Sequence, residues 1–471
     1  MSNHTSSEAL LAQSFGDVVG DVGGFVWGPL LLIPLLLLTG LYLTIVLRGL
    51  QFRTLVRAMR LAFVHRDEAD AEGDISHYQA LTTALAATIG VGNIAGVATA
   101  IHFGGPGALF WMWVTGLVGM ATKYAEAFLG VRFRRREADG KQNGGPHLYL
   151  RDGVGGGFGK ALGVMFAAFA VLASFGIGNG SQANTVAGAL EDQFGVAPGL
   201  TGAVLVVGAA LVILGGITAI GRFTAAFVPL MAVTYMVAAS VVLAANASEL
   251  PDAIGLIFSS AFSGEAVAGG GAAVAFLTIL RYGVARGIFS NESGLGTGAI
   301  AAAAARTTSP VRQALVSMTQ TFLDTIVVVT FTGLVIVTTG AWENELEGAD
   351  KTSAAFSMGL PGEWGGAIVA ISVVFFAFST LLGWSYYGER SITHLAGDKA
   401  VTPYRLVFLV VIFVGAMADL EVVWDLSDIA NGLMALPNLI GLLILSPMVV
   451  RETRAYLADP ETRLRERAGG R

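Results

Sequence analysis

The stretch T-I-G-V-G-N-I-A-G, residues 88–96, interrupts an apolar segment that runs from about Tyr78 to Phe103. Each glycine inside a helix costs up to about 1 kcal/mol relative to alanine, so three glycines and an asparagine disfavour a continuous helix. The flanks, residues 80–87 and 95–101, are good apolar helix formers. A membrane tolerates unwound backbone only where protein or a cavity surrounds it. The stretch therefore predicts a membrane-crossing helix in two halves, whose break offers bare amides and carbonyls to a small zwitterion and a cation.

Two other interpretations of this stretch exist. The glycines could serve only the close packing of helices, as small residues do in membranes. The G-x-G pattern also resembles a dinucleotide-binding fingerprint, but that fingerprint needs a preceding strand in a soluble βαβ unit. The sequence supplies no such strand, so we exclude dinucleotide binding.

The composition places the chain in a membrane. Of its 471 residues 54% are hydrophobic and only 13% are charged, whereas soluble domains contain about 25% charged residues. Apolar runs of eighteen or more residues recur along the chain, which indicates a polytopic all-α membrane protein. The net charge of −6 is too mild to indicate a nucleic-acid partner, and the absence of cysteine excludes disulfides. No basic region precedes the first apolar run, so we expect no signal peptide.

Eleven spans are expected, and the basic residues orient them. Connections after odd-numbered spans carry Lys and Arg, whereas the others carry Lys351 alone. Because cytoplasmic loops are enriched in Lys and Arg, we expect a plasma-membrane protein with the N-terminus outside and the C-terminus in the cytoplasm. The spans are 25–48, 78–103, 107–133, 159–190, 200–220, 223–245, 271–304, 310–340, 362–385, 404–419 and 427–450.

A second break lies in the seventh span, at S-N-E-S-G-L-G-T-G, residues 290–298. It comes five spans after the first break, so its helix crosses in the opposite direction. Two interrupted helices at matching positions of two halves indicate an inverted-repeat transporter with a site at the membrane midplane. We expect a single transporter domain with a five-plus-five core: the half-repeats 78–245 and 271–450, an additional N-terminal span at 25–48 and a cytoplasmic tail at 451–471.

Two adjacent hydroxyls, Ser379 and Thr380, lie in the apolar ninth span. Such hydroxyls often bond only to the carbonyl four residues earlier. In an inverted-repeat core, however, the ninth span packs against the first broken helix. Hydroxyl and carbonyl oxygens suit hard cations, so we predict a sodium site made by these two hydroxyls with the carbonyls of Ala86, Ile89 and Phe376.

Other polar residues in the spans have open roles. Phe175, Gln182 and Asn184 in the fourth span could form a substrate wall, or the two polar residues could make interhelical hydrogen bonds. Glu292 in the second break is a functional candidate by default. It could pair with Arg281 or Arg286, or face a substrate ammonium or a cation.

Four further residues in the spans are polar or aromatic. Lys123 and Glu126 are three apart on one helix face and are expected to neutralise each other. Asp324 receives no role from the sequence. Trp384 is expected to pack or to lie at the interface.

The chain resembles the alanine or glycine:cation symporters, that is, the sodium:alanine symporter family. The motifs that carry the resemblance fall in order across most of the chain. They are T-I-G-V-G-N-I-A-G-V-A-T-A-I (88–101), G-G-P-G-A-L-F-W-M-W (104–113), K-Y-A-E (123–126), G-G-P-H-L-Y-L (144–150), F-S-N-E-S-G-L-G (289–296), A-A-A-A-A-R-T (301–307) and G-W-S-Y-Y-G-E (383–389).

The resemblance implies the leucine-transporter-type fold and a site between the breaks. Amides near Val91 and Gly92 would hold a substrate carboxylate, and the second break would take the ammonium and the small side chain. Ser379 and Thr380 match the common sodium site of that fold. The family usually has threonine where Val91 stands, so that hydroxyl contact would be lost. The full expected substrate set is Thr88, Val91, Gly92, Asn93, Phe175, Gln182, Asn184, Asn291, Glu292, Gly294 and Thr297.

We therefore expect a secondary active symporter that imports alanine or glycine with Na⁺ as the co-transported ion. No cofactor is expected, and the protein should act as a monomer. The sequence lacks H-E-x-x-H and G-x-S-x-G, which disfavours an enzyme. Proton coupling through Glu292 or Asp324, a ligand-gated channel and a non-transporting amino-acid sensor stay open as alternatives.

Overall fold

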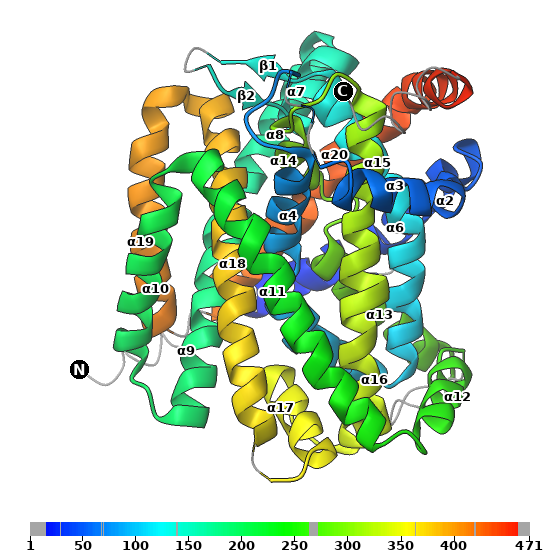
Figure 1. Cartoon of the computed structure of the whole chain (residues 1–471), viewed down its shortest axis with the longest axis vertical. Coiled ribbons are helices and arrows are strands. Elements are labelled where there is room, and N and C mark those ends of the chain that lie inside the picture. The colour runs from blue at the N-terminus through cyan, green and yellow to red at the C-terminus, as the bar shows by residue number, and fades with distance from the viewer. Residues whose placement is uncertain are drawn as a thin grey trace.

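The computed structural model describes residues 16–459 except residues 29, 67, 69, 138–139, 263–271, 363 and 419–420. Figure 1 shows a bundle of long helices that run nearly parallel to the longest axis. In the described residues the strands are β1 (Arg135–Arg136) and β2 (Gln142–Asn143), which pair antiparallel. The expectation of an all-α membrane protein is thus confirmed at the level of fold class.

The first half of the core begins with the interrupted segment, which forms α4, a short 3₁₀ turn and α5. Next come the long α6, the short α7 and η2, a long helix with a π-helical turn at its middle, and a helical hairpin. Their bounds are α4 (His77–Thr88), η1 (Val91–Asn93), α5 (Ala95–Gly104), α6 (Gly107–Arg132), α7 (Pro146–Tyr149), η2 (Leu150–Val154), α8 (Gly156–Phe175), η3 (Gly176–Gly180), α9 (Ser181–Phe194), α10 (Pro198–Ile213) and α11 (Gly216–Ala245).

The second half presents the same order of elements after a connecting helix, α12 (Leu250–Ser260). A broken helix, a long helix, a short helix, another long helix and a hairpin follow one another again. Their bounds are α13 (Ala272–Asn291), α14 (Gly298–Ala303), α15 (Pro310–Thr321), η4 (Phe322–Val329), α16 (Thr330–Thr338), η5 (Ala341–Glu343), α17 (Gly348–Gly359), α18 (Trp364–Ala396), η6 (Asp398–Ala400), α19 (Val401–Met417) and α20 (Glu421–Ala458).

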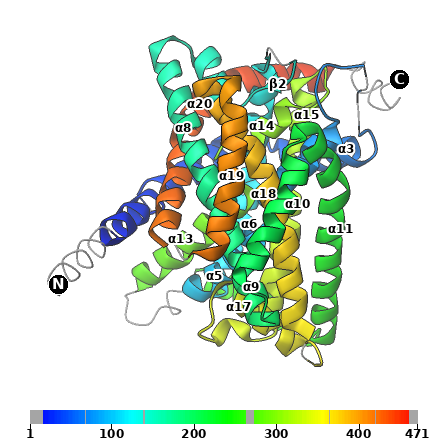
Figure 2. The same ribbon diagram turned by 90° about the vertical axis from the view of Figure 1, so that its left-hand side faces the viewer.

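The two broken helices lie antiparallel, because α13 packs on α5 while α14 packs on α4. The hairpin helix α10 lies beside α19, as Figures 1 and 2 both show. Each partner in that pair comes from the corresponding place in its own half. The two breaks predicted from the sequence are therefore present, and the inverted repeat stays a prediction.

Among the described residues, six helices are long and apolar enough to cross a membrane by themselves. The outer surface agrees with that, since α11, one of the six, exposes Leu230, Val233 and Val237. α2 (Leu32–Val46) and α3 (Leu50–Phe63) would add a seventh crossing if counted together, although the chain bends by 81° between them. The count of eleven spans stays a prediction.

Two predicted boundaries are wrong. Residues 25–48 are not one continuous helix: residues 16–26 are helical, the chain then turns, and α2 begins at Leu32. The turn between the fifth and sixth spans lies at Gly215 and Gly216, where φ of Gly216 is 65°. Arg222 was expected in that connection but lies inside α11, because the paired glycines stop α10 earlier.

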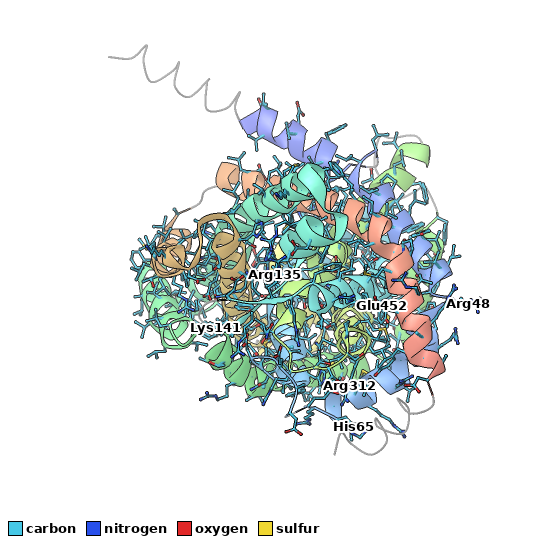
Figure 3. All side chains as sticks on the ribbon, turned by 90° about the horizontal axis from the view of Figure 1, so that it is seen from above. Arg48, His65, Arg135, Lys141, Arg312 and Glu452 are labelled. Carbon is cyan, nitrogen blue, oxygen red and sulfur yellow. The ribbon has the colours of Figure 1, made fainter. Side chains whose placement is uncertain are left out.

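The two ends of the bundle differ in charge. α7, β1 and β2 lie at one end and α12 and α17 at the other (Figure 1). Figure 3 looks onto the first end and labels basic side chains on several elements, among them Arg48, Arg135 and Arg312. At the opposite end Lys351 is buried and its ammonium donates to the carbonyls of Ala341 and Asn344. Four of the basic residues predicted on one side of the membrane, Arg48, Arg135, Lys141 and Arg312, thus share one end of the bundle.

Candidate binding site between two broken helices

The first break has the unwound backbone that its glycines predict. α4 ends at Thr88, and Gly90 is extended with φ −132° and ψ −157°. The N–H of Gly90 donates to Asn93 Oδ1 at 3.0 Å, so the asparagine satisfies one of the freed amides. The N–H of Val91 donates to Gln182 Oε1 over 3.4 Å, which is a long hydrogen bond.

The second break contains three residues with a left-handed backbone conformation. Glu292, Gly294 and Gly296 have φ of 56°, 98° and 88°. This left-handed region costs a non-glycine residue roughly 1–2 kcal/mol. Glu292 is held there by three contacts: its N–H donates to Ile288 O at 2.8 Å, and its carboxylate accepts from Thr297 Oγ1 at 2.6 Å. The third contact comes from Lys123, whose Nζ donates to the Glu292 carbonyl at 3.0 Å.

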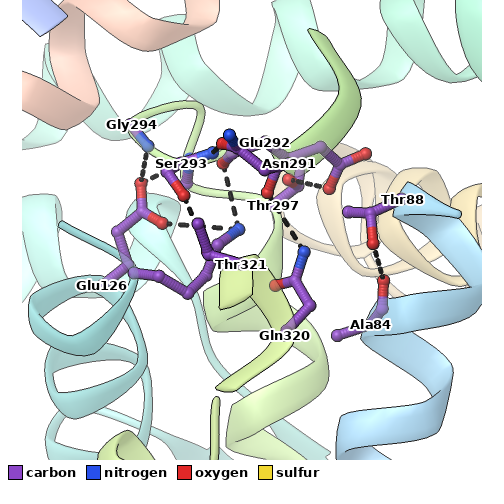
Figure 4. A network of polar contacts seen from close by, with 12 residues as sticks. Ala84, Thr88, Glu126, Asn291, Glu292, Ser293, Gly294, Thr297, Gln320 and Thr321 are labelled. Atoms are coloured by element: carbon purple, nitrogen blue, oxygen red, sulfur yellow. Dashed lines mark hydrogen bonds and ion pairs between the residues drawn. The ribbon is translucent and has the colours of Figure 1, made fainter. Parts of the chain in front are cut away.

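A buried carboxylate, Glu126 of α6, fixes the second break (Figure 4). Its Oε1 accepts from the backbone N–H groups of Gly294 and Gly296, both at 2.9 Å, and from Asn438 Nδ2 at 2.8 Å. Lys123 Nζ lies 3.8 Å from Glu126 Oε2, so the expected pairing of these two residues is confirmed. The sequence did not indicate that the pair also binds the break.

Asp324 joins the two breaks to each other. Its Oδ1 accepts from Asn93 Nδ2 of the first break at 2.7 Å, and its Oδ2 accepts from Ser290 Oγ of α13 at 2.8 Å. The hydroxyl of Thr325 also donates to Oδ2 at 2.8 Å. A fully buried carboxylate needs such donors, because burying a charge without partners is costly. Asp324 therefore sets the spacing of the two unwound segments.

The oxygens expected to bind sodium converge between α4 and α18. Ser379 Oγ lies 3.3 Å from Ala86 O, 3.4 Å from Ile89 O and 2.8 Å from Phe376 O. Thr380 Oγ1 lies 3.1 Å from both Ala86 O and Phe376 O. Both side chains are buried. The structure thus brings together all five predicted residues in a cluster of two hydroxyls and three carbonyls without a carboxylate.

A small cavity lies beside this oxygen cluster. It leaves about 10 Å³ for the centre of a water-sized molecule, which is roughly the space of one water. The conformation is therefore closed around the site, and a larger ligand requires the walls to separate. The cavity is lined by Ala87, Thr88, Gly90, Gly92, Ile177, Gln182, Phe289, Glu292, Leu295, Thr380, Trp384 and Asn431.

Four residues of the expected substrate set line this cavity: Thr88, Gly92, Gln182 and Glu292. Five other members make hydrogen bonds in and around the two breaks. Asn291 Nδ2 donates to Thr325 Oγ1 at 3.1 Å, and Val91, Asn93, Gly294 and Thr297 make the break contacts given above.

Two members of the set face a different part of the protein. Phe175 packs against the rings of Tyr404 and Phe408 on α19. Asn184 Nδ2 donates to the carbonyl of Ala418 at 3.3 Å. Neither residue lines the central cavity, and the hydrogen bond of Asn184 to the end of α19 favours the interhelical interpretation for it.

The structure also decides two local alternatives. The Glu292 carboxylate bonds to Thr297, and no ion pair joins it to Arg281 or Arg286 within the described residues. Trp384, expected to pack or lie at the interface, is buried and lines the cavity.

Two further cavity residues escaped the sequence reasoning. Asn431 of α20 is 1% exposed, and in the described part of the chain its Oδ1 has no hydrogen-bond partner. Phe289 of α13 lines the central cavity and also a second cavity of about 190 Å³ next to Arg281, Asp425 and Asp428. Phe289 therefore lines both the central cavity and this more polar second one.

At the arginine-rich end, the connection before α4 closes over the end of α14. Ile75 pairs with Ala305 in an isolated bridge. Arg134 donates to four carbonyls, those of Ala303 at 3.2 Å, Ala305 at 2.6 Å, Glu72 at 2.9 Å and Thr307 at 3.0 Å. The guanidinium thus ties the second broken helix to this connection.

Glu68 anchors the same connection to α15. Its Oε1 lies 2.5 Å from Arg312 Nη1, and its Oε2 accepts from the N–H of Thr308 at 2.9 Å. Partial burial raises the pKa of the Glu68 carboxyl, but His77, Arg312 and the Thr308 amide outweigh burial and lower that pKa to about 2. The carboxylate is therefore charged at neutral pH and holds the closure.

Comparison with known proteins adds to this geometry. A sequence model of the sodium:alanine symporter family matches residues 12–468. The chain belongs to the sodium:alanine symporter family. It is 54% identical over 449 residues to the sodium/alanine symporter AgcS of Methanococcus maripaludis, covering 94% of this chain and 98% of the relative. It is 36% identical to a Bacillus subtilis protein named probable sodium/glutamine symporter GlnT, covering 95% and 91% of the two chains.

Members of the sodium:alanine symporter family are transporters, not enzymes. The family and the long apolar helices together make the chain a multi-pass membrane protein that carries out cation-coupled amino-acid symport. The resemblance found from the motifs is confirmed.

Proposed function

We propose that this family member imports a small neutral amino acid, alanine or glycine, together with Na⁺ by alternating access. The observation that carries the proposal is the oxygen cluster between α4 and α18, which shares Thr380 with the central cavity. An ion in this cluster and a solute in the cavity would contact the same short segment of the first break.

The composition of the cluster favours Na⁺. Hydroxyl and carbonyl oxygens suit a hard cation, and the lack of a carboxylate fits a singly charged ion that must leave in every cycle. Bound there, Na⁺ would join Ala86 and Ile89 of the first broken helix to α18. Coupling then follows, because an ion shifts a conformational equilibrium only when it binds one state more tightly than the other.

The cavity offers groups for both ends of an amino acid. The N–H of Val91 makes only a long hydrogen bond to Gln182, so a substrate carboxylate can replace that acceptor and gain the positive end of a helix dipole. Asn431 Oδ1, which has no hydrogen-bond partner among the described residues, and the Glu292 carboxylate can accept hydrogen bonds from the substrate ammonium. The cavity walls formed by Ile177, Phe289 and Trp384 leave little space for the side chain of a bound amino acid, which supports a small substrate.

We propose the leucine-transporter-type inverted repeat for the core, with half-repeats 78–245 and 271–450, an additional N-terminal span and a cytoplasmic tail at 451–471. The matching order of elements and the antiparallel broken helices support this proposal. The gathering of basic residues at the α7 end supports a cytoplasmic location of that end in the plasma membrane. A monomer contains both breaks and the oxygen cluster, so one chain suffices for the site.

The test is uptake of radiolabelled amino acids into proteoliposomes that contain the purified full-length protein. We expect a Na⁺ gradient to drive accumulation of alanine or glycine, whereas equal K⁺ or H⁺ gradients do not. Accumulation driven by protons alone would contradict Na⁺ coupling and would indicate that Glu292 or Asp324 carries the coupled proton. Binding without accumulation would indicate a sensor, and current beyond the coupled charge would indicate a channel.

Competition separates the substrates. Alanine and glycine should displace each other, while glutamine, the substrate in the name of one relative, should compete poorly because the cavity walls leave no room for its amide. Strong inhibition by glutamine would contradict the assignment of a small substrate.

A further inference from the structure

Helix α3 lies across the bundle rather than along it. The chain turns at Arg48 and Gly49, both in the left-handed region with φ of 58° and 62°, and α3 leaves α2 at an angle of 81°. α3 packs on α15, α4 and α6 through a buried side that includes Leu50 and Leu61. Its opposite side exposes Phe52 to 61% and Val56 to 73%. α3 is therefore an amphipathic helix at the arginine-rich end, with apolar side chains directed away from the protein.

A cavity of about 720 Å³ lies between α3 and the last turns of α20. Apolar residues, among them Leu47, Val56, Leu61 and Leu457, form one part of its lining. The titratable residues of its lining are all basic: Arg48, Arg53, Arg57, Arg60, His65 and Arg454.

Two acidic residues flank this lining on α20 and at its end. Glu452 directly precedes the lining residue Thr453, and its carboxylate is 3.4 Å from Arg132 Nε. Asp459 directly follows the lining residue Ala458. Arg57 lies over the ring of Tyr456, with 5.6 Å between its Cζ and the ring centroid. Arg454 Nη2 donates to the Val46 carbonyl over 3.3 Å. These contacts hold Arg57 and Arg454 beside the cavity that they line.

An occupant of this cavity must combine an anionic group with apolar chains. Arginine binds phosphate through two parallel hydrogen bonds, and basic pockets beside membrane helices bind anionic lipid headgroups. The exposed Phe52 and Val56 beside the cavity supply a surface for acyl chains at the depth of an interfacial helix. Figure 3 shows Arg48 at the edge of this region, next to α20.

We infer that the cavity between α3 and α20 is a binding site for an anionic phospholipid, with the headgroup phosphate among Arg53, Arg60 and Arg454. The lipid joins α3, which leads into the first broken helix, to the end of the last helix. It therefore stabilises the closed arrangement at the arginine-rich end. The inference does not depend on which amino acid the protein transports.

The experiment measures thermal unfolding of the purified full-length protein in neutral detergent while short-chain phosphatidylglycerol is added. We expect the melting temperature to rise with phosphatidylglycerol, and to stay constant with phosphatidylcholine of the same chain length or with inorganic phosphate. An equal rise with phosphatidylcholine would overturn the inference, because it would show a general lipid effect. An equal rise with inorganic phosphate would overturn it in favour of a soluble anion.

A triple variant locates the site. Arg53→Gln, Arg60→Gln and Arg454→Gln together should weaken phosphatidylglycerol binding by roughly 100-fold, since one arginine near an anionic lipid contributes roughly fivefold. The matched control is Arg451→Gln, an exposed arginine on the same helix as Arg454 that does not line the cavity. It should bind phosphatidylglycerol as the natural protein does.

Unchanged binding by the triple variant, or an equal loss in the control, would overturn the assignment to this cavity. If the triple glutamine variant does not fold, replacing the same three residues by lysine provides the second measurement. Lysine keeps the charge but cannot form the two parallel hydrogen bonds of a guanidinium group. Phosphatidylglycerol should therefore raise the melting temperature of the triple lysine variant less than that of the natural protein, while the Arg451→Lys control should respond as the natural protein does. A triple lysine variant that responds to phosphatidylglycerol as strongly as this control would overturn the assignment to these three residues.

Discussion

Replacing Thr380 by alanine removes one hydroxyl from the proposed sodium site and little else. Thr380 is 3% exposed, and its Oγ1 lies 3.1 Å from Phe376 O, one turn earlier in α18. That carbonyl also accepts from Ser379 at 2.8 Å, so the variant leaves it with a partner. A neutral hydrogen bond contributes about 1 kcal/mol to stability, and the fold should therefore tolerate the change.

The effect on the ion is larger than the effect on the fold. Na⁺ at the cluster would lose one of five oxygens, and interactions with a charged group contribute about 1.5–3 kcal/mol each. This loss corresponds to roughly 10- to 100-fold weaker ion binding. The sodium concentration that gives half-maximal uptake should rise by that factor, while uptake at saturating sodium should fall less.

The assay is initial uptake of radiolabelled alanine into proteoliposomes as a function of external sodium. Thr380→Ser keeps the hydroxyl and should resemble the natural protein, whereas Thr380→Val keeps the shape and should behave as Thr380→Ala does. An unchanged sodium dependence in both the alanine and the valine variants would refute the assignment of this cluster. A serine variant as defective as the valine variant would show that packing, rather than the oxygen, matters.

Three other changes test neighbouring features. Gly90→Ala would place its Cβ 2.3 Å from Thr380 Oγ1, so uptake should fall at least tenfold, on the order of the loss of one ion ligand, while Gly96→Ala, with no heavy atom within 4 Å of its Cβ, should transport normally. Asp324→Asn replaces the carboxylate that joins the two breaks and should lower stability by about 2 kcal/mol in thermal unfolding; an unchanged melting temperature would contradict its bridging role. Glu68→Gln should lower the melting temperature at pH 7 and lose this effect as the pH falls from 4.5 toward 2. The reason is that the natural carboxyl, whose pKa is lowered from 4.5 to about 2, contributes its stability only while it is ionised. A difference in melting temperature between the natural protein and Glu68→Gln that stays constant down to pH 3 would contradict the role of the Glu68 carboxylate in holding this end closed.

Backbone chemistry explains why much of the site could be predicted from the sequence. Glycine-rich interruptions leave unwound backbone wherever they fall, so both breaks follow from local composition. The pairing of Ser379 and Thr380 with Ala86 and Ile89 needed one further step, the packing of the ninth span on the first broken helix. That step came from the order of elements rather than from any single residue.

Residues brought in by distant elements could not be predicted in this way. Asn431 lies more than 300 positions from the first break, and only the packing of α20 places its amide at the cavity. Asn184 and Phe175 carried the same kind of local signal as Gln182, yet their rotation about the helix axis directs them to α19 and its following turn. A π-helical turn at Gly176–Gly180 lies between Phe175 and Gln182 and changes that rotation. The sequence offers no reliable sign of such a turn.

The carboxylate of Asp324 also constrains which parts of the protein can move apart. It accepts hydrogen bonds from Asn93 of the first break and from Ser290 at the end of α13, so α5, α13 and η4 should travel as one body during transport. The polar contacts described across the seam between α4 and α18 are, by contrast, those of Ser379 and Thr380 with two backbone carbonyls. Spin labels on α5 and α13 should therefore report a constant separation when sodium is removed, and labels across the α4–α18 seam a variable one. Bound Na⁺ would then hold α4 and α18 together, and its release would allow these two rigid parts to separate.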